Sequence, residues 1–301
     1  MKYFYYPGCS LEGTAQEYNL STETFMAAVG AELIEIQDWV CCGASAAAPT
    51  SHLLSLALPA INLAIAERAN AENQNGNLDI LVPCSACYIN LKRVEEVTRK
   101  DTALLNKINL VLEVEGHQLQ GNIHVRHLLD VIVRDMGMET FRERLKKPLD
   151  GISVAPYYGC QCLRPYRVFD DPEDPRSMEP ILKAVGASVH PWNKGGQCCG
   201  ASHTTTKPEV GLELVAAILK EAKGADAIVT VCPMCQMNLE AYQKKISRKY
   251  HEDIDITILY LPQLLCLAFG LSENKIGLDL NLSVTDQFRE KIGLKQRKSS
   301  E

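Results

Sequence analysis

The same five-residue segment occurs twice in this sequence, and that duplication constrains the fold more than any other feature. Cys-Cys-Gly-Ala-Ser occupies residues 41–45 and again residues 198–202. Each copy has one cysteine upstream, after an aromatic stretch that ends in glycine, and a Cys-x-x-Cys pair followed by Asn-Leu downstream. Ten of the twelve cysteines therefore form two matching sets: Cys9, Cys41, Cys42, Cys84 and Cys87, and then Cys160, Cys198, Cys199, Cys232 and Cys235.

The spacing of the two sets predicts the domain organisation. Matched cysteines are offset by about 150 residues, half the length of the chain, which is far longer than the repeat of a solenoid. We therefore expect two similar domains, residues 1–150 and 151–282, with the boundary near Pro148-Leu149-Asp150-Gly151. Residues 283–301 form a charged tail that we expect to be loose or to dock on a partner.

Apolar runs and helical spacing alternate along both halves, which predicts the fold class. Strands are expected at 1–6, 31–36, 78–82, 152–157, 188–191, 227–231 and 254–259, with helices between them that include 125–136 and 233–248. Such alternation is typical of α/β proteins, so we expect two pseudo-symmetric, Rossmann-like domains, each a parallel sheet with flanking helices. Every cysteine motif follows an expected strand, with Cys9 on a loop, and so belongs at the ligand-binding edge of its sheet.

Composition excludes several classes of function. The net charge is −6 and no basic block is interleaved with aromatic residues, so binding to nucleic acid is not expected. No apolar run approaches the ~20 residues that span a bilayer, and the N-terminus lacks the apolar core of a signal peptide. We expect a cytoplasmic protein, and because disulfides are rare in that compartment, the cysteines indicate metal or redox chemistry.

Four interpretations of the cysteines compete. Zinc takes four ligands, whereas each set has five thiols and two of them are adjacent. A redox-active dithiol fits each Cys-x-x-Cys pair and leaves the other three cysteines of a set unexplained. A buried structural role suits Cys266 and Cys162, but does not explain two matched sets. Iron–sulfur clusters are the fourth interpretation, with adjacent thiolates reaching two irons of one cluster.

The two patterns, Cys-x31-Cys-Cys-Gly-x40-Cys-x-x-Cys and Cys-x37-Cys-Cys-Gly-x31-Cys-x-x-Cys, resemble the paired CCG domains of the B subunit of heterodisulfide reductase. The resemblance extends from Cys9 to about Phe269, and the residues around Cys9 are similar to those of bacterial members. It implies that each set of five cysteines binds one noncubane [4Fe-4S] cluster. It also implies catalytic reduction of a disulfide to two thiols, as the family does for the coenzyme M–coenzyme B disulfide in methanogens. The implied partners are two further subunits of such a complex, one ferredoxin-like and one flavin-containing.

Two clusters suit this reaction because a disulfide takes two electrons and an ordinary iron–sulfur centre supplies one. No nicotinamide or flavin fingerprint is present, so the electrons come from a partner protein. The alternative function is electron or sulfur transfer within a related sulfur-oxidising complex, linked to lipoate or a sulfane. Cationic side chains near the second set are candidates for binding the anionic tails of a small-molecule disulfide: Arg164, Lys194, His203 and Lys207.

Overall fold

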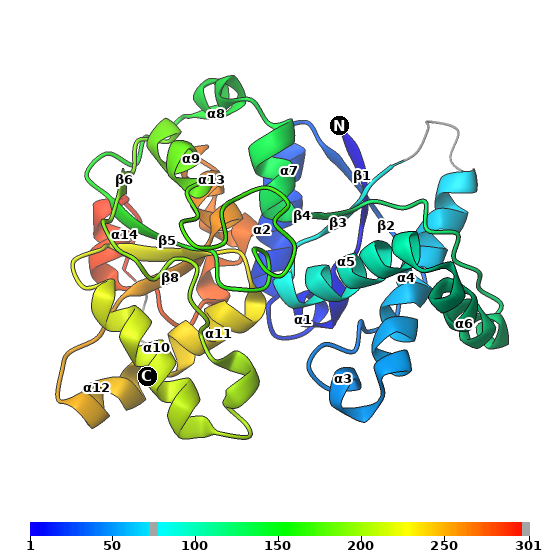
Figure 1. The fold of residues 1–301 in the computed structure, drawn as a ribbon. Coiled ribbons are helices and arrows are strands. Elements are labelled where there is room, and N and C mark those ends of the chain that lie inside the picture. Colours follow the sequence, from blue (N-terminus) through cyan, green and yellow to red (C-terminus); the bar gives the residue numbers. More distant parts are fainter. Residues whose placement is uncertain (73–77, 297–301) are drawn as a thin grey trace.

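A computed structural model describes residues 1–72 and 78–296, which form an α/β fold with two parallel sheets (Figure 1). The strands of the first sheet lie in the order β2-β1-β3-β4, and those of the second in the order β6-β5-β7-β8. The two orders are equivalent, so the second half repeats the topology of the first. The predicted pair of parallel sheets with flanking helices is confirmed.

The first half, drawn from blue to green in Figure 1, has two short strands at its centre that pair as Phe4 with Ile80 and Tyr5 with Leu81. Its strands are β1 (Lys2–Tyr5), β2 (Glu32–Glu35), β3 (Ile80–Val82) and β4 (Val125–His127). Its helices are α1 (Gly8–Glu12), α2 (Gln16–Ala28), α3 (Ala47–Thr50), α4 (His52–Glu72), α5 (Ser85–Lys100), α6 (Thr102–Leu112), η1 (Glu113–Glu115), α7 (Leu128–Asp135) and α8 (Met138–Arg144).

The second half has the longer central pairing, from Val154 with Ala227 to Tyr157 with Thr230. Its strands are β5 (Ser153–Tyr157), β6 (Ser188–Val189), β7 (Ala227–Thr230) and β8 (Thr257–Tyr260). Its helices are α9 (Met178–Ala184), η2 (Ala201–His203), α10 (Pro208–Glu221), α11 (Pro233–Ala241), α12 (Gln243–Tyr250), α13 (Leu261–Ala268), η3 (Glu273–Ile276), η4 (Leu278–Leu280) and α14 (Asp286–Lys291). All residues of β7 are buried, as a parallel strand covered on both faces requires.

Three expected elements differ from the structure. The segment 125–136, expected as one helix, is strand β4 followed at once by α7, because His127 caps the helix by accepting the Leu129 N–H at 3.1 Å. The expected helix 233–248 divides at Tyr242 into α11 and α12. Cys9, expected on a loop, lies in the short helix α1.

The tail does not behave as expected over its described part. Residues 283–292 pack onto the second half through Phe288 and Ile292, which are 1% and 4% exposed. The Ser283 hydroxyl accepts a hydrogen bond from Gln243 at 3.0 Å, and α14 follows. The expectation of a loose tail is therefore wrong for this segment, because its apolar residues recur at helical spacing. Residues 297–301 lie outside the described residues.

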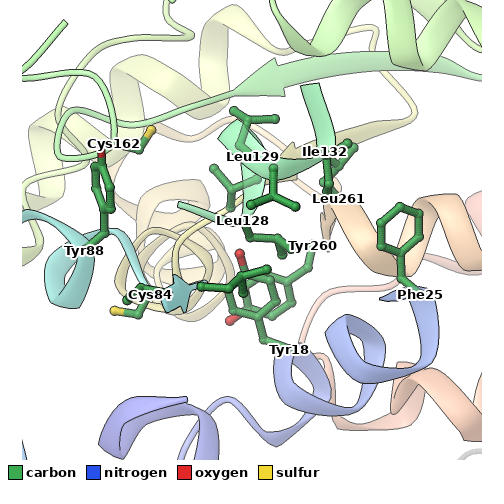
Figure 2. Close-up of a cluster of buried hydrophobic side chains, with 14 of the residues drawn as sticks. Tyr18, Phe25, Cys84, Tyr88, Leu128, Leu129, Ile132, Cys162, Tyr260 and Leu261 are labelled. Atoms are coloured by element: carbon green, nitrogen blue, oxygen red, sulfur yellow. The ribbon is translucent and has the colours of Figure 1, made fainter. Parts of the chain in front are cut away.

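The two halves are joined by one continuous apolar core. The helix after the fourth strand of each sheet packs against the other half: α13 against α2, and α7 against α9. At the centre, Tyr18 of α2 stacks on Tyr260 with ring centroids 4.0 Å apart and planes at 3° (Figure 2). Leu128 and Leu261, one from each half, lie in the same cluster. This shared core holds the two cysteine-bearing sheet edges in a fixed relation.

Glu240 on α11 is a buried carboxylate that should govern part of the pH dependence of stability. Burial raises its pKa from 4.5 to about 7, although the Ser283 N–H donates to it at 3.2 Å. A raised pKa in the folded state means that the stabilising contribution is complete below about pH 4.5 and is lost as the pH rises through about 7. The loss is on the order of 3 kcal/mol.

We therefore expect Glu240→Gln to be less sensitive to pH than the parent protein. Urea unfolding of both proteins at about pH 5 and about pH 8 measures the effect. The parent protein should lose stability between the two conditions, and the variant should lose less. An equal loss in both proteins contradicts this role for Glu240.

Candidate metal centre

The first thiol set lies at the carboxyl-terminal edge of the first sheet. Cys9 is in α1 directly after β1, the Cys41-Cys42 pair is in the loop after β2, and Cys84 and Cys87 open α5 after β3. The Sγ atoms of Cys42 and Cys87 are 3.3 Å apart, and those of Cys9 and Cys41 are 3.8 Å apart. Residues far apart in the sequence are thus brought together because parallel strands end at the same edge.

The second set repeats this arrangement on the second sheet. Cys160 follows β5, the Cys198-Cys199 pair follows β6, and Cys232 and Cys235 open α11 after β7. The Sγ atoms of Cys199 and Cys235 are 3.6 Å apart, which matches the pair formed by Cys42 and Cys87. The structure therefore brings together the thiols of each predicted set.

Two equivalent glycines leave space for the thiols. Gly8 has φ +71° and Gly159 has φ +70°, in the left-handed region that favours glycine. A Cβ atom at Gly8 would lie 3.0 Å from the Cys87 sulfur, and one at Gly159 would lie 3.0 Å from the Cys235 sulfur. The glycine before the first cysteine of each set is thus required by backbone conformation and by close approach of a thiol.

Each set has a buried floor and a more accessible rim. In the first set Cys42, Cys84 and Cys87 are buried, whereas Cys9 and Cys41 are exposed. In the second set the equivalent three are buried, and Cys160 and Cys198 are half-buried. Ligands that reach the surface on one side suit a centre that exchanges electrons with another molecule.

Hydrogen bonds favour the thiolate form at one position of each cysteine pair. The Cys87 thiol, and then the Asn90 amide, lower the pKa of Cys42 to about 7. A hydrogen bond from Cys160, helped by the Gly200 N–H at 3.3 Å, lowers the pKa of Cys198 to about 6. Thiolates are the form that binds metal.

The five thiols of the second set surround a cavity of about 60 Å³. Its opposite wall comes from the first half, through Ala44, Ser45, Ser85 and Ala86. Within residues 1–72 and 78–296, no group of three or more His, Cys, Asp or Glu side chains is arranged to hold a metal ion. Five thiols that line one cavity exceed the four ligands of a single zinc ion and suit the thiolate donors of an iron–sulfur cluster.

The two sets meet at the centre of the molecule. Interaction with the Cys232 thiol and burial raise the pKa of Cys84, against the lowering effect of the Cys87 thiol, so the first cysteines of the two Cys-x-x-Cys pairs are neighbours. Ser85, next in the chain, donates to the Val231 carbonyl at 3.2 Å and lies 3.1 Å from His127 Nε2. Burial lowers the pKa of His127 to about 4, so this ring is neutral and serves the contact between the halves.

Two cysteines lie outside the sets. Cys162 is 1% exposed and its thiol donates to the Tyr158 carbonyl at 3.1 Å. Figure 2 shows it among the buried side chains of the core. Cys266 is fully buried on α13, 3.9 Å from the Ser21 carbonyl. Both thiols have backbone partners, as expected for structural cysteines.

The cationic candidates do not line the cavity. Arg164 donates to the Gly196 carbonyl at 2.8 Å and pairs with Glu173 at 3.0 Å, so it holds a loop. His203 and Lys207 are exposed beyond the second cysteine pair, and Lys194 is half-buried before it. Their role in binding substrate remains a prediction.

Asn90 and Asn238 were missed as site residues, although each follows its Cys-x-x-Cys pair. Asn90 Nδ2 donates to the Cys42 sulfur at 3.7 Å, and Asn238 Nδ2 donates to the Cys199 carbonyl at 3.2 Å. The repeated Asn-Leu was the available signal, because a residue three positions after a helical cysteine lies on the same face.

The family model described as CCG, cysteine-rich domain, matches residues 3–92 and 154–240. The chain belongs to this family. Both matched segments contain a complete thiol set, so the predicted relationship to the B subunit of heterodisulfide reductase is confirmed at the level of the CCG domain. The CCG repeat accounts for the two sheets, the two thiol sets and their equivalent glycines.

Several relatives of this CCG protein are named as parts of redox complexes. The membrane anchor subunit of the 8-methylmenaquinol:fumarate reductase of Wolinella succinogenes is 34% identical over 285 residues, 93% of this chain and 96% of that protein. A protein of Archaeoglobus profundus, named as like the B subunit of heterodisulfide reductase, is 28% identical over 92% of this chain and 93% of that protein. The B subunit of the ferredoxin:CoB-CoM heterodisulfide reductase of Methanosarcina mazei is 29% identical over 76% of this chain and 78% of that protein.

The fold of this CCG protein is shared by a solved structure of a hypothetical protein from Helicobacter pylori. The two superpose with a TM-score of 0.75 at 18% identity, over 94% of this chain and 52% of the Helicobacter pylori chain. None of the helices in the described part of the chain has the length and hydropathy to cross a membrane. The CCG family, its relatives and the thiol donor set together indicate an iron–sulfur oxidoreductase family.

Proposed function

We propose that this chain is the disulfide-reducing B subunit of a heterodisulfide reductase-like complex. It reduces a small-molecule disulfide to two thiols with electrons from an iron–sulfur partner. The observation that carries the proposal is the meeting of two equivalent five-thiol sets at Cys84 and Cys232, where the next residue, Ser85, donates to the carbonyl of the preceding residue, Val231, at 3.2 Å. A reaction of two electrons is served by two such sites in one chain.

The proposed cofactors are two [4Fe-4S] clusters of the noncubane type, one in each thiol set. When bound, they supply electrons one at a time. The chain holds each with a buried floor of three thiolates and two more accessible ones. The adjacent cysteines of each pair serve different irons, because neighbouring residues seldom chelate one small ion together.

The substrate is proposed to lie beside the cluster of the second set, on the side where the first half contributes small and uncharged residues. Ala44, Ser45 and Ser85 leave this wall open to a disulfide group. Exposed His203 and Lys207, with half-buried Lys194, are proposed to attract anionic tails outside the cavity. Arg164 would contribute only after release from Glu173.

The proposed partners are two subunits of the complex, one ferredoxin-like and, behind it, one flavin-containing. The exposed thiols Cys9 and Cys41 support electron entry at the first set, because a partner can approach them from the surface. The proposal thus assigns electron entry to the first half and substrate to the second.

A second candidate function is electron transfer alone, within a complex that reduces a different substrate. It is favoured by the relative that is 34% identical over almost the whole chain and is named as part of a fumarate reductase. The same ten cysteines serve both functions. They differ in whether a disulfide reacts at the second set.

Anaerobic purification with iron, sulfide and zinc analysis tests the cofactor assignment, and a panel of disulfides with a one-electron donor tests the activity. We expect iron for about two clusters per chain and thiol release from at least one disulfide. One cluster per chain, or zinc in place of iron, contradicts the cofactor assignment. Two clusters without any disulfide reduction favour the electron-transfer function.

A further inference from the structure

The asparagine that follows each Cys-x-x-Cys pair has a different hydrogen-bond acceptor in the two halves. Asn90 lies three residues after Cys87 on α5 and donates from Nδ2 to the Cys42 sulfur at 3.7 Å. Asn238 lies three residues after Cys235 on α11 and donates from Nδ2 to the Cys199 main-chain carbonyl at 3.2 Å. The two positions are equivalent in sequence and in the fold, but only one amide reaches a thiol.

The surroundings of the two asparagines match this difference. Asn238 is 6% exposed, and its bond satisfies the buried carbonyl of Cys199. Asn90 is half-buried at the rim of the first set, and its acceptor, the Cys42 sulfur, is 1% exposed and 3.3 Å from the Cys87 sulfur. An N–H that points at a buried sulfur is a dipole that acts directly on a proposed ligand, as the Gly200 N–H does at Cys198.

We propose that Asn90 is a positioning residue that raises the reduction potential of the cluster held by the first thiol set, by donating its amide N–H to the Cys42 sulfur. Asn238 instead fixes the loop of the second set and leaves the potential unchanged. The inference rests on the proposed iron–sulfur function and goes beyond it by assigning different roles to the two equivalent asparagines.

The physical reason is electrostatic. A reduced cluster carries one more negative charge than an oxidised one, and this charge is shared with the thiolate sulfurs. A donor aimed at a ligand sulfur stabilises the reduced state more than the oxidised state, so the potential rises. A donor aimed at a backbone carbonyl interacts mainly with that carbonyl and contributes to folding instead.

The test is a redox titration of the anaerobically purified, iron-loaded protein, in which electron paramagnetic resonance detects the reduction of each cluster. Asn90→Leu removes the donor with little change in volume, and Asn90→Asp replaces it with an acceptor of the same shape. We expect one of the two reduction steps to move to lower potential in both variants. Titration in the Cys199→Ser background, where only the first cluster is assembled, assigns the step that moves.

Asn238→Leu is the matched control. We expect both potentials to stay at their parent values while the melting temperature falls, because the Cys199 carbonyl loses its partner. Unchanged potentials in Asn90→Asp and Asn90→Leu, at full iron content, overturn the inference and leave the proposed function intact. Equal shifts from Asn90→Leu and Asn238→Leu also overturn it. If the anaerobically purified parent protein contains no iron, that result overturns the cluster assignment itself.

Discussion

Replacing Cys199 by serine is expected to remove about half of the iron and to abolish disulfide reduction. Cys199 is buried, and its sulfur lies 3.6 Å from that of Cys235 on the floor of the second set. Serine offers a hard oxygen that is protonated at neutral pH, whereas iron in clusters is held by soft thiolates. Because the first set is formed by separate strands, its cluster should remain.

Iron and sulfide analysis of anaerobically purified Cys199→Ser measures the loss. The control is Cys266→Ser, which removes a thiol that is also buried. Cys266 belongs to α13 and contacts the Ser21 carbonyl, outside both thiol sets. We expect the control to keep the iron content of the parent protein. Full iron in Cys199→Ser, or the same loss in the control, contradicts the assignment of ligands.

The two thiol sets were accessible from the sequence because their spacing repeats and because each motif follows a recognisable strand. Cys9 and Cys160, the most isolated members, could be grouped with the other cysteines only because the same pattern occurs twice. The supporting glycines were also visible, at Gly8 and Gly159, although their purpose requires the distance to a thiol from another strand.

Other features could not be predicted from local pattern. Strand β4 has only three residues and runs directly into α7, so the helical periodicity of α7 extends over it and only pairing with β3 identifies it. The loop-holding role of Arg164 depends on Glu173 and on the Gly196 carbonyl, which lies 32 residues away. Tertiary contacts of this kind leave no periodic signal.

The position of the two sets relative to each other was also outside the reach of the sequence. It depends on α13 packing against α2, so that helices from opposite halves share one core. The apolar run 262–269 predicts a buried helix without indicating which half buries it. The contact between the sets therefore also depends on core residues outside the two thiol sets.

Tyr18→Ala should lower the free energy of unfolding by about 3–5 kcal/mol. Tyr18 is completely buried and its ring stacks on Tyr260 from the other half at 4.0 Å. Its hydroxyl donates to the Pro83 carbonyl at 3.1 Å, immediately before Cys84. The truncation leaves a cavity between the halves and an unpaired carbonyl beside a ligand.

Tyr18→Phe separates these two contributions, because it keeps the ring and removes only the hydroxyl. We expect it to cost about 1 kcal/mol, the usual value for one lost hydrogen bond. Urea unfolding of both variants under anaerobic conditions provides the comparison. A cost for Tyr18→Ala no larger than that for Tyr18→Phe contradicts a packing role for the stack. A measurable cost for Tyr18→Phe shows in addition that the hydroxyl of this residue supports the segment that brings Cys84 to Cys232.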